Sequence, residues 1–415
     1  MFTLLALALF GLVASTGPER APEVPTLAVA AIAGDQDAVA SLRALGQPGL
    51  DQLVKLRREL SSVPPLFFGP QTPAVKAWEA AWEALLDNVA RQRYASASGL
   101  YWYTDFEAAK AEARLQKKPI LSLRLLGALD SDFSCANSRF FRTILYPDPA
   151  IAQALHDGWI LHWESVREVP KITIDFGDGR VLRRTITGNS LHYAMTADGE
   201  VTEIMPGMVG PTTFLTWLTA ARELTHEVAA LPPATRIARI AAHLANDYDV
   251  RLTAWRAALR QVGIRSRRDY GSLVAATDAK ALDQLAALKG PVTVSAEATR
   301  LIGALMPGWS ARSAELAMPL AVTKSRTEVG LLRQVSPVEG TLAKDEVQNE
   351  LVLKTHIAQL MLDNPERLSG DRVVELTQVI YAAAFLTPLD DPWMGLAPED
   401  IFTGLPPELE KTAAQ

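Results

Sequence analysis

The sequence predicts an α+β protein in which an α/β middle region lies between two all-α regions. The chain has 415 residues, of which 48% are hydrophobic and 21% are charged, a composition typical of a folded protein. Residues 26–93 and the chain after Pro232 repeat apolar side chains three and four positions apart, which is the spacing of amphipathic helices. Between them, short apolar runs and Asp-Gly pairs indicate strands and hairpins.

Charge and residue counts exclude several classes of function. The formal net charge is −6, from 47 acidic and 41 basic residues, so nothing indicates nucleic acid as a partner. A single cysteine, Cys135, excludes an internal disulfide and a multi-cysteine metal site. The six histidines form no HExxH pattern and no His-x-His pair. We therefore expect no metal site and no cofactor.

The amino terminus has the pattern of an export signal. Residues 3–14 form an uninterrupted apolar run, too short for a comfortable transmembrane helix but long enough for the apolar part of a secretory signal peptide. We predict a signal peptide over 1–16 and an exported, periplasmic or extracellular, protein; an uncleaved anchor is the alternative. No later run reaches the length of a membrane span, so we expect no stable membrane insertion after signal removal.

The helical N-terminal region is predicted to cover residues 17–99. A helical pair is expected over 35–57, and a longer helix over 74–93. Trp78 and Trp82 share one face of the longer helix with Leu85. Tryptophans at this spacing are typical of a core or a docking face.

The middle region, residues 100–230, alternates helices with apolar strands. The expected elements, in order, are a helix over 105–116 capped by Thr104 or Asp105, a buried strand over 120–126, a helix from Cys135, a helix over 149–156, a strand over 159–163, hairpins at Asp178-Gly179 and Asp198-Gly199, and a closing helix over 211–229. The first hairpin, 171–187, is interpreted as an insertion.

The C-terminal domain, residues 231–415, reads as all-α. Its expected helices are 234–262, 278–288, 296–305, 344–363 and 370–385. The tail that follows Phe385 carries apolar residues among prolines, which predicts either a segment folded back over a helical face or a strip that docks a partner. No motif in this domain indicates a chemical activity.

The order of elements in the middle region resembles that of a thioredoxin-like domain. The residues that carry the resemblance are Lys-Pro at 118–119 before the apolar strand, Cys-Ala-Asn-Ser at 135–138, and the strand Trp159–Trp163 with the later hairpin and helix. The resemblance implies a thioredoxin-like α/β sandwich with a Cys-x-x-Ser motif in place of Cys-x-x-Cys. It also implies that Cys135 is the nucleophile and that Ser138 stands where the resolving cysteine would be.

The candidate site gathers around the expected helix at Cys135. A thiol at a helix N-terminus lies near unpaired N–H groups, which lower its pKa. Arg139, one turn along this helix, is a candidate to stabilise the thiolate. The resemblance places Asn189 and Ser190 in the substrate groove, where the family has a cis-proline. It also places His192 near the cysteine as a general base, unless the strand alternation turns this side chain away.

Two functions of different classes follow. In the first, the chain is a monothiol redox protein of the oxidoreductase or isomerase type, which exchanges Cys135 with a protein thiol or disulfide partner. In the alternative, the chain is a non-catalytic scaffold or protein-interaction module with a degenerate thioredoxin-like fold. The redox function requires a Cys135 that is open to a cleft, whereas the scaffold allows a buried one. The sequence makes no prediction of the oligomeric state.

Overall fold

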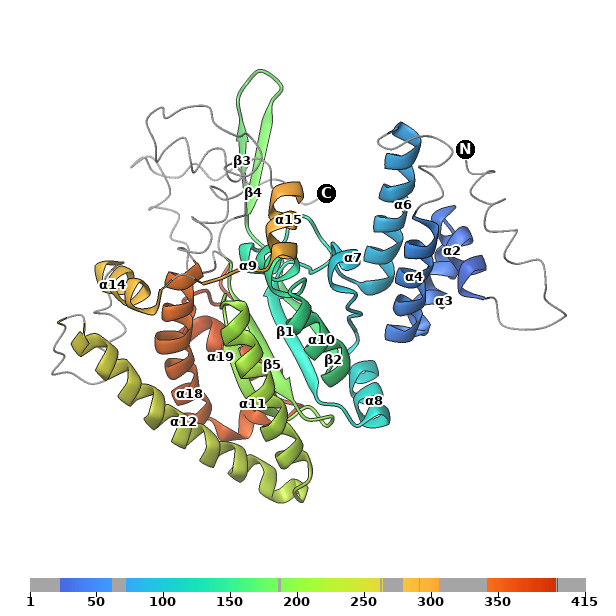
Figure 1. Ribbon diagram of the computed structural model, residues 1–415. Coiled ribbons are helices and arrows are strands. Elements are labelled where there is room, and N and C mark those ends of the chain that lie inside the picture. The colour runs from blue at the N-terminus through green and yellow to red at the C-terminus, as the bar shows by residue number, and fades with distance from the viewer. Residues whose placement is uncertain are drawn as a thin grey trace.

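The computed structural model places a four-stranded and a two-stranded sheet among helices (Figure 1). It describes residues 23–61, 72–185, 188–261, 263, 279–290, 292–305, 342–392 and 394. The predicted α+β class is therefore confirmed. The predicted signal peptide lies outside the described residues. Within the described part of the chain, no helix is both long and apolar enough to cross a membrane.

The N-terminal helices have a core of their own. They are α2 (Val24–Ile32), α3 (Gln36–Ala44), α4 (Gly46–Leu60), α6 (Pro73–Ala90) and the short α7 (Ala95–Ser98). Asp35 caps α3 by accepting hydrogen bonds from two backbone N–H groups. Trp78 and Trp82 are buried in this core with ring centres 6.1 Å apart. Their role is packing, as the spacing indicated.

The four-stranded sheet has the order β2-β1-β5-β6. Its strands are β1 (Ile120–Leu126), β2 (Ile160–Arg167), β5 (Ser190–Met195) and β6 (Val201–Pro206). β1 pairs with β2 in parallel and with β5 in antiparallel orientation. Every residue of β1 is buried, which explains why this strand reads as a nearly continuous apolar run.

Helices cover both faces of this sheet. The helices around it are α8 (Phe106–Gln116), α9 (Ala136–Phe140), the π-helix η1 (Phe141–Leu145), α10 (Pro149–Gly158) and α11 (Pro211–Ala229). Asp105 caps α8 through a hydrogen bond of 2.9 Å from the N–H of Ala108. On one face His192 of β5 contacts rings of η1 and α11, and on the other face His162 of β2 contacts Phe106 of α8.

The two-stranded sheet is a hairpin that projects from the body of the protein (Figure 1). It consists of β3 (Lys171–Asp175) and β4 (Val181–Thr185), which pair in antiparallel orientation. The turn spans three residues, 177–179, instead of the two-residue Asp-Gly turn expected, and Gly177 and Gly179 have positive φ values of 74° and 86°, which glycine adopts without strain.

The C-terminal helices contribute to the core of the sheet, and some of them also form a smaller separate cluster. They are α12 (Pro233–Gln261), α14 (Ala279–Lys289), α15 (Ala296–Leu305), the π-helix η2 (Gln348–Leu353), α18 (Lys354–Asp363), the 3-10 helix η3 (Pro365–Leu368) and α19 (Val373–Ala383). Ile240 of α12 and Ile380 of α19 belong to the same buried cluster as Leu123 of β1. Glu346 also accepts a hydrogen bond of 2.6 Å from the N–H of Gly210, at the N-terminus of α11.

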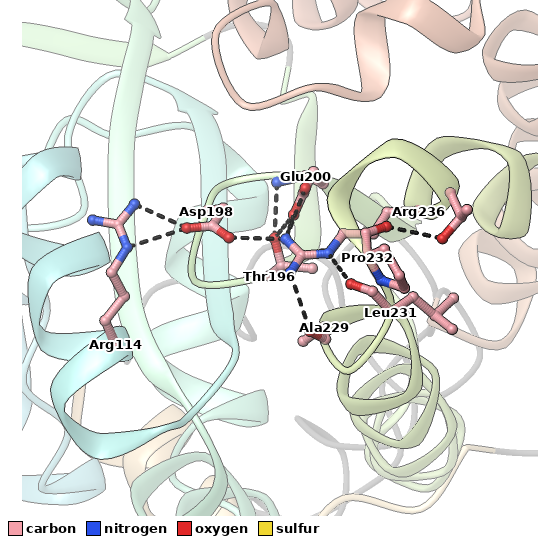
Figure 2. Close-up of polar contacts among 9 residues, drawn as sticks. Arg114, Thr196, Asp198, Glu200, Ala229, Leu231, Pro232 and Arg236 are labelled. Carbon is pink, nitrogen blue, oxygen red and sulfur yellow. Dashed lines mark hydrogen bonds and ion pairs between the residues drawn. The ribbon is translucent and has the colours of Figure 1, made fainter.

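Charged side chains bind the β5–β6 turn to two helices (Figure 2). Asp198 in this turn accepts hydrogen bonds from Arg114 of α8 at 3.1 and 3.2 Å, and from Arg236 of α12 at 2.8 Å. Arg236 also donates to the main-chain carbonyls of Ala229 and Leu231. A single guanidinium therefore joins the sheet to the connection between α11 and α12, and fixes where the C-terminal helices begin.

Candidate functional site

Cys135 lies at the N-terminus of α9, the position that the sequence predicted for it. It is the N-cap residue, and its Sγ accepts a hydrogen bond of 3.4 Å from the N–H of Ser138. Its own N–H donates to the carbonyl of Leu126, where β1 ends. The end of the buried strand therefore sets the position of the thiol against the helix.

Burial decides the acidity of this thiol. Cys135 has no exposed surface. Burial raises the pKa of the thiol and outweighs the N–H groups of Ser138 and Asn137 and the charge of Arg139, which lower it. The expectation of a lowered pKa is therefore wrong, because the helix N-terminus is present but the desolvation of the charged form has the larger effect. The thiol is neutral at neutral pH.

Three polar residues that follow Cys135 on α9 and η1 surround the thiol and the loop before it. Ser138 is fully buried, and its hydroxyl has no hydrogen-bond partner among the described residues. Arg139 is half-buried, and its charge acts on the thiol. One turn further, Arg142 is buried and donates to the carbonyls of Leu129 and Ser131, at 2.8 and 2.7 Å. Arg142 therefore fastens the loop before Cys135.

The two acidic residues of that loop pair elsewhere. Asp130 lies 3.7 Å from Arg91, and Asp132 lies 2.9 Å from Arg93. Both arginines follow α6 in the chain, so these ion pairs join the loop to the N-terminal helices. The loop is therefore held by the N-terminal helices on one side and by Arg142 on the other.

His192 is on the side of the sheet that faces η1, but its hydrogen-bond partner is not the thiol. Its Nε2 lies 2.8 Å from the hydroxyl of Tyr146, and its ring packs against Phe141 and Phe214. Burial lowers the pKa of His192 to about 3. A neutral imidazole bound to a phenol is a structural group here, and the structure does not place it as a base for Cys135.

Asn189 and Ser190 lie beside α9, where the sequence placed the substrate groove. The amide of Asn137 donates to the hydroxyl of Ser190 at 2.9 Å. Asn189 donates to the hydroxyl of Thr387 at 3.0 Å, and its carbonyl accepts from the hydroxyl of Tyr381 at 3.0 Å. The side-chain amide and the main-chain carbonyl of Asn189 are therefore both bonded to the C-terminal segment.

The residues that follow α19 make further contacts with the sheet. Arg167 at the end of β2 donates to the carbonyls of Leu389 and Pro392, at 3.3 and 3.0 Å. Met394 is buried in the shared core. Burial raises the pKa of the Tyr381 phenol well above its usual value, and the proximity of Cys135 raises it further. Tyr381 and Cys135 belong to the same buried core.

A polar row on the other face of the sheet was missed by sequence reasoning. Ser122 of β1 lies 2.9 Å from His162 of β2, and the next residues on this face, Arg124 and Glu164, form an ion pair. Arg124 is buried, which lowers its pKa to about 10. A lone arginine in an otherwise apolar strand was the available signal, because a buried cation requires a partner on the neighbouring strand.

A buried carboxylate on β6 was also missed. Glu203 lies 3.3 Å from Lys354 of α18 and 2.9 Å from His243 of α12, and it accepts from the indole of Trp217 at 3.2 Å. Burial alone would raise the pKa of Glu203, but Lys354 and then His243 outweigh it and lower the pKa. The cluster joins three helices to the sheet, and no local spacing in the sequence indicates it.

Comparison with known proteins gives no family for this chain. No family model matches it, and neither a curated protein nor a solved structure does. Among the described residues, no group of three or more histidines, cysteines and acids lies close enough together to hold a metal ion. The candidate site is thus defined by its geometry alone: a buried, neutral thiol at a helix N-terminus, beneath a C-terminal cover.

Proposed function

We propose that this protein is a non-catalytic scaffold or protein-interaction module with a degenerate thioredoxin-like middle domain. The observation that carries the proposal is the complete burial of Cys135. A thiol that reacts with a protein disulfide needs access and a stabilised thiolate, and burial opposes both. Cys135 then serves as the N-cap of α9 and as a packing residue.

The middle region supports the thioredoxin-like part of the proposal. β1 is followed by a helix whose N-terminus carries Cys135, and β5, β6 and α11 close the unit in the expected order. Asn189 and Ser190 lie against α9. The hydrogen bonds of Asn189 with Thr387 and Tyr381 support a degenerate site, because they use groups of Asn189 that would otherwise be available to a substrate backbone.

One observation favours monothiol exchange as a second candidate function. Cys135 accepts the Ser138 N–H at the N-terminus of α9, a position that favours a thiolate once the thiol is solvated. After release of the C-terminal cover, the Cys135 thiolate would attack one sulfur of a partner disulfide, and the other sulfur would leave and take a proton. Ser138 cannot resolve the resulting mixed disulfide, so an external thiol would have to do so.

Alkylation of Cys135 separates the two functions. The rate of reaction with iodoacetamide is measured against pH in the folded protein and again in urea, with Cys135→Ser as the blank. The scaffold predicts little reaction in the folded protein and complete reaction after unfolding. Fast alkylation of the folded protein, with a midpoint well below the free-thiol value of about 8.5, would overturn the proposal and favour the redox function in its place.

A further inference from the structure

The β3–β4 hairpin is the one part of the described chain that stands as a two-stranded sheet. Such a ribbon is marginally stable in water, and it gains stability from further strands or from a packed face. In Figure 1 it extends away from the four-stranded sheet. All residues of β3 except Ile172 are exposed, so the ribbon is open to a partner.

One face of this ribbon is apolar. Directly opposed residues of an antiparallel pair point to the same face, and Ile174 is opposite Leu182. Ile172 lies on this face because it is two positions from Ile174, and Phe176 lies there for the same reason. Ile174 and Phe176 are 45% and 55% exposed. A soluble ribbon with this face and two open edges is a site for strand pairing.

The backbone shows which groups of β3 point away from β4. The N–H of Phe176 donates to the carbonyl of Arg180 at 3.1 Å, so the pairs Ile174–Leu182 and Ile172–Arg184 are the hydrogen-bonded pairs of the regular ladder. The alternate residues Lys171, Thr173 and Asp175 then direct their N–H and C=O groups to the outer edge of β3.

We propose that a second copy of this chain pairs on this edge, β3 against β3, in antiparallel orientation about a two-fold axis at Thr173. The two Thr173 residues then face each other, and Lys171 of each copy lies opposite Asp175 of the other. Ile172 of each copy likewise lies opposite Ile174 of the other. The pairing uses every outward-facing group of the three residues and places two opposite charges together twice.

Charge selects this arrangement over its alternatives. A two-fold axis at Ile174 would set Thr173 against Asp175 and leave Lys171 without an acidic partner. Pairing through the outer edge of β4 about Arg183 would oppose two arginines, which is unfavourable. With the axis at Thr173, the two ribbons form a four-stranded sheet in the order β4-β3-β3-β4, with Ile172, Ile174 and Leu182 of both copies on one face.

This inference names a partner for the proposed interaction module and in that sense rests on the proposed function. The two fail differently. A monomeric protein would remove this partner and leave Cys135 unreactive, whereas a reactive Cys135 would overturn the module without dissociating the dimer.

Replacement of Thr173 by proline tests whether the outer edge of β3 forms the dimer. The mass of the full chain in solution is measured by sedimentation equilibrium from micromolar to near-millimolar concentration. Thr173→Pro removes an N–H that the ladder with β4 does not use, so the hairpin is retained. The matched control is Arg183→Pro, directly opposite Thr173 on β4. We expect a dimer for the wild type and Arg183→Pro, and a monomer for Thr173→Pro. A monomeric wild type, or equal loss in both variants, would overturn the proposal.

Charge reversal tests the register. Lys171→Glu turns two attractive cross-strand pairs into two repulsive ones, while Arg183→Glu makes the same change of charge on the other strand. We expect the dissociation constant of the dimer to rise at least tenfold for Lys171→Glu and to change little for Arg183→Glu. Circular dichroism shows that both variants are folded. Equal effects of the two variants would show that net charge, and not this register, governs association, and would overturn the pairing.

Discussion

The hydroxyl of Tyr381 on α19 donates a hydrogen bond of 3.0 Å to the main-chain carbonyl of Asn189, at the start of β5. The two residues are 192 positions apart in the chain, and Tyr381 is completely buried. This contact joins the last described helix to the N-terminal end of β5, an interior strand of the sheet. The C-terminal region is therefore attached to the main chain two residues before Leu191, in the same buried core that contains Cys135.

Tyr381→Phe should loosen this cover. The ring remains, but the buried carbonyl of Asn189 loses its donor, so we expect the free energy of unfolding to fall by about 1–3 kcal/mol. Local opening of α19 becomes more frequent, and Cys135 in the folded protein should be alkylated several-fold faster. Tyr248→Phe, on α12, is the control and should leave the alkylation rate unchanged. An unchanged rate in Tyr381→Phe would show that another segment controls access to the thiol.

The local elements could be predicted from the sequence because their signals are local. β1 follows from the nearly continuous apolar run at 120–126, α8 from its Asp105 cap, and both hairpins from their Asp-Gly pairs. The expected continuous helix from Cys135 is instead α9 followed by the π-helix Phe141–Leu145. Apolar spacing does not distinguish a π-turn from an α-turn, so the π-helix could not be predicted from the sequence.

The character of the site could not be predicted in the same way. Residue types and spacing placed Cys135 at a helix N-terminus, and the resemblance to thioredoxin-like domains placed Asn189 and Ser190 beside it. The side chains that close the site, Tyr381 and Thr387, come from about two hundred positions later. The sign of the pKa shift of Cys135 depends on that long-range packing, because desolvation is a property of everything that surrounds the thiol.

The buried Glu203–Lys354 pair should couple α18 to the sheet. The two charges are 3.3 Å apart, and both side chains are less than 8% exposed. Lys354→Met leaves the carboxylate without its main counter-charge, so we expect a loss of about 3–5 kcal/mol in the free energy of unfolding. Adding Glu203→Gln should restore part of it, because the unpaired charge is then gone.

A double-mutant cycle, measured by urea denaturation, gives the coupling of this pair. Lys55→Met is the control, because Lys55 and Glu59 form an exposed pair on α4 and should contribute less than about 1 kcal/mol. If the double variant is as unstable as the sum of the two single variants, Lys354 and Glu203 are not coupled and the interpretation of the cluster fails.

The buried histidines should make the fold sensitive to acid. Burial lowers the pKa of His192 to about 3. The pKa of His162 is also lowered to about 3, mainly by burial and to a smaller extent by the charge of Arg124. The unfolded chain has histidine pKa values of about 6.5, so between about pH 6.5 and pH 3 the unfolded state binds more protons than the folded state. The free energy of unfolding therefore falls as the pH falls through this window, by up to about 1.4 kcal/mol per pH unit for each histidine.

His192→Gln tests this dependence, because glutamine keeps a polar partner for Tyr146 but does not titrate. We expect the slope of the free energy of unfolding against pH, measured by urea denaturation from about pH 4 to about pH 6, to decrease by the equivalent of one proton. His226→Gln, on the exposed side of α11, should keep the wild-type slope. An unchanged slope in His192→Gln would mean that this imidazole is accessible to protons in the folded protein, and so that the cover over η1 and Cys135 opens without unfolding.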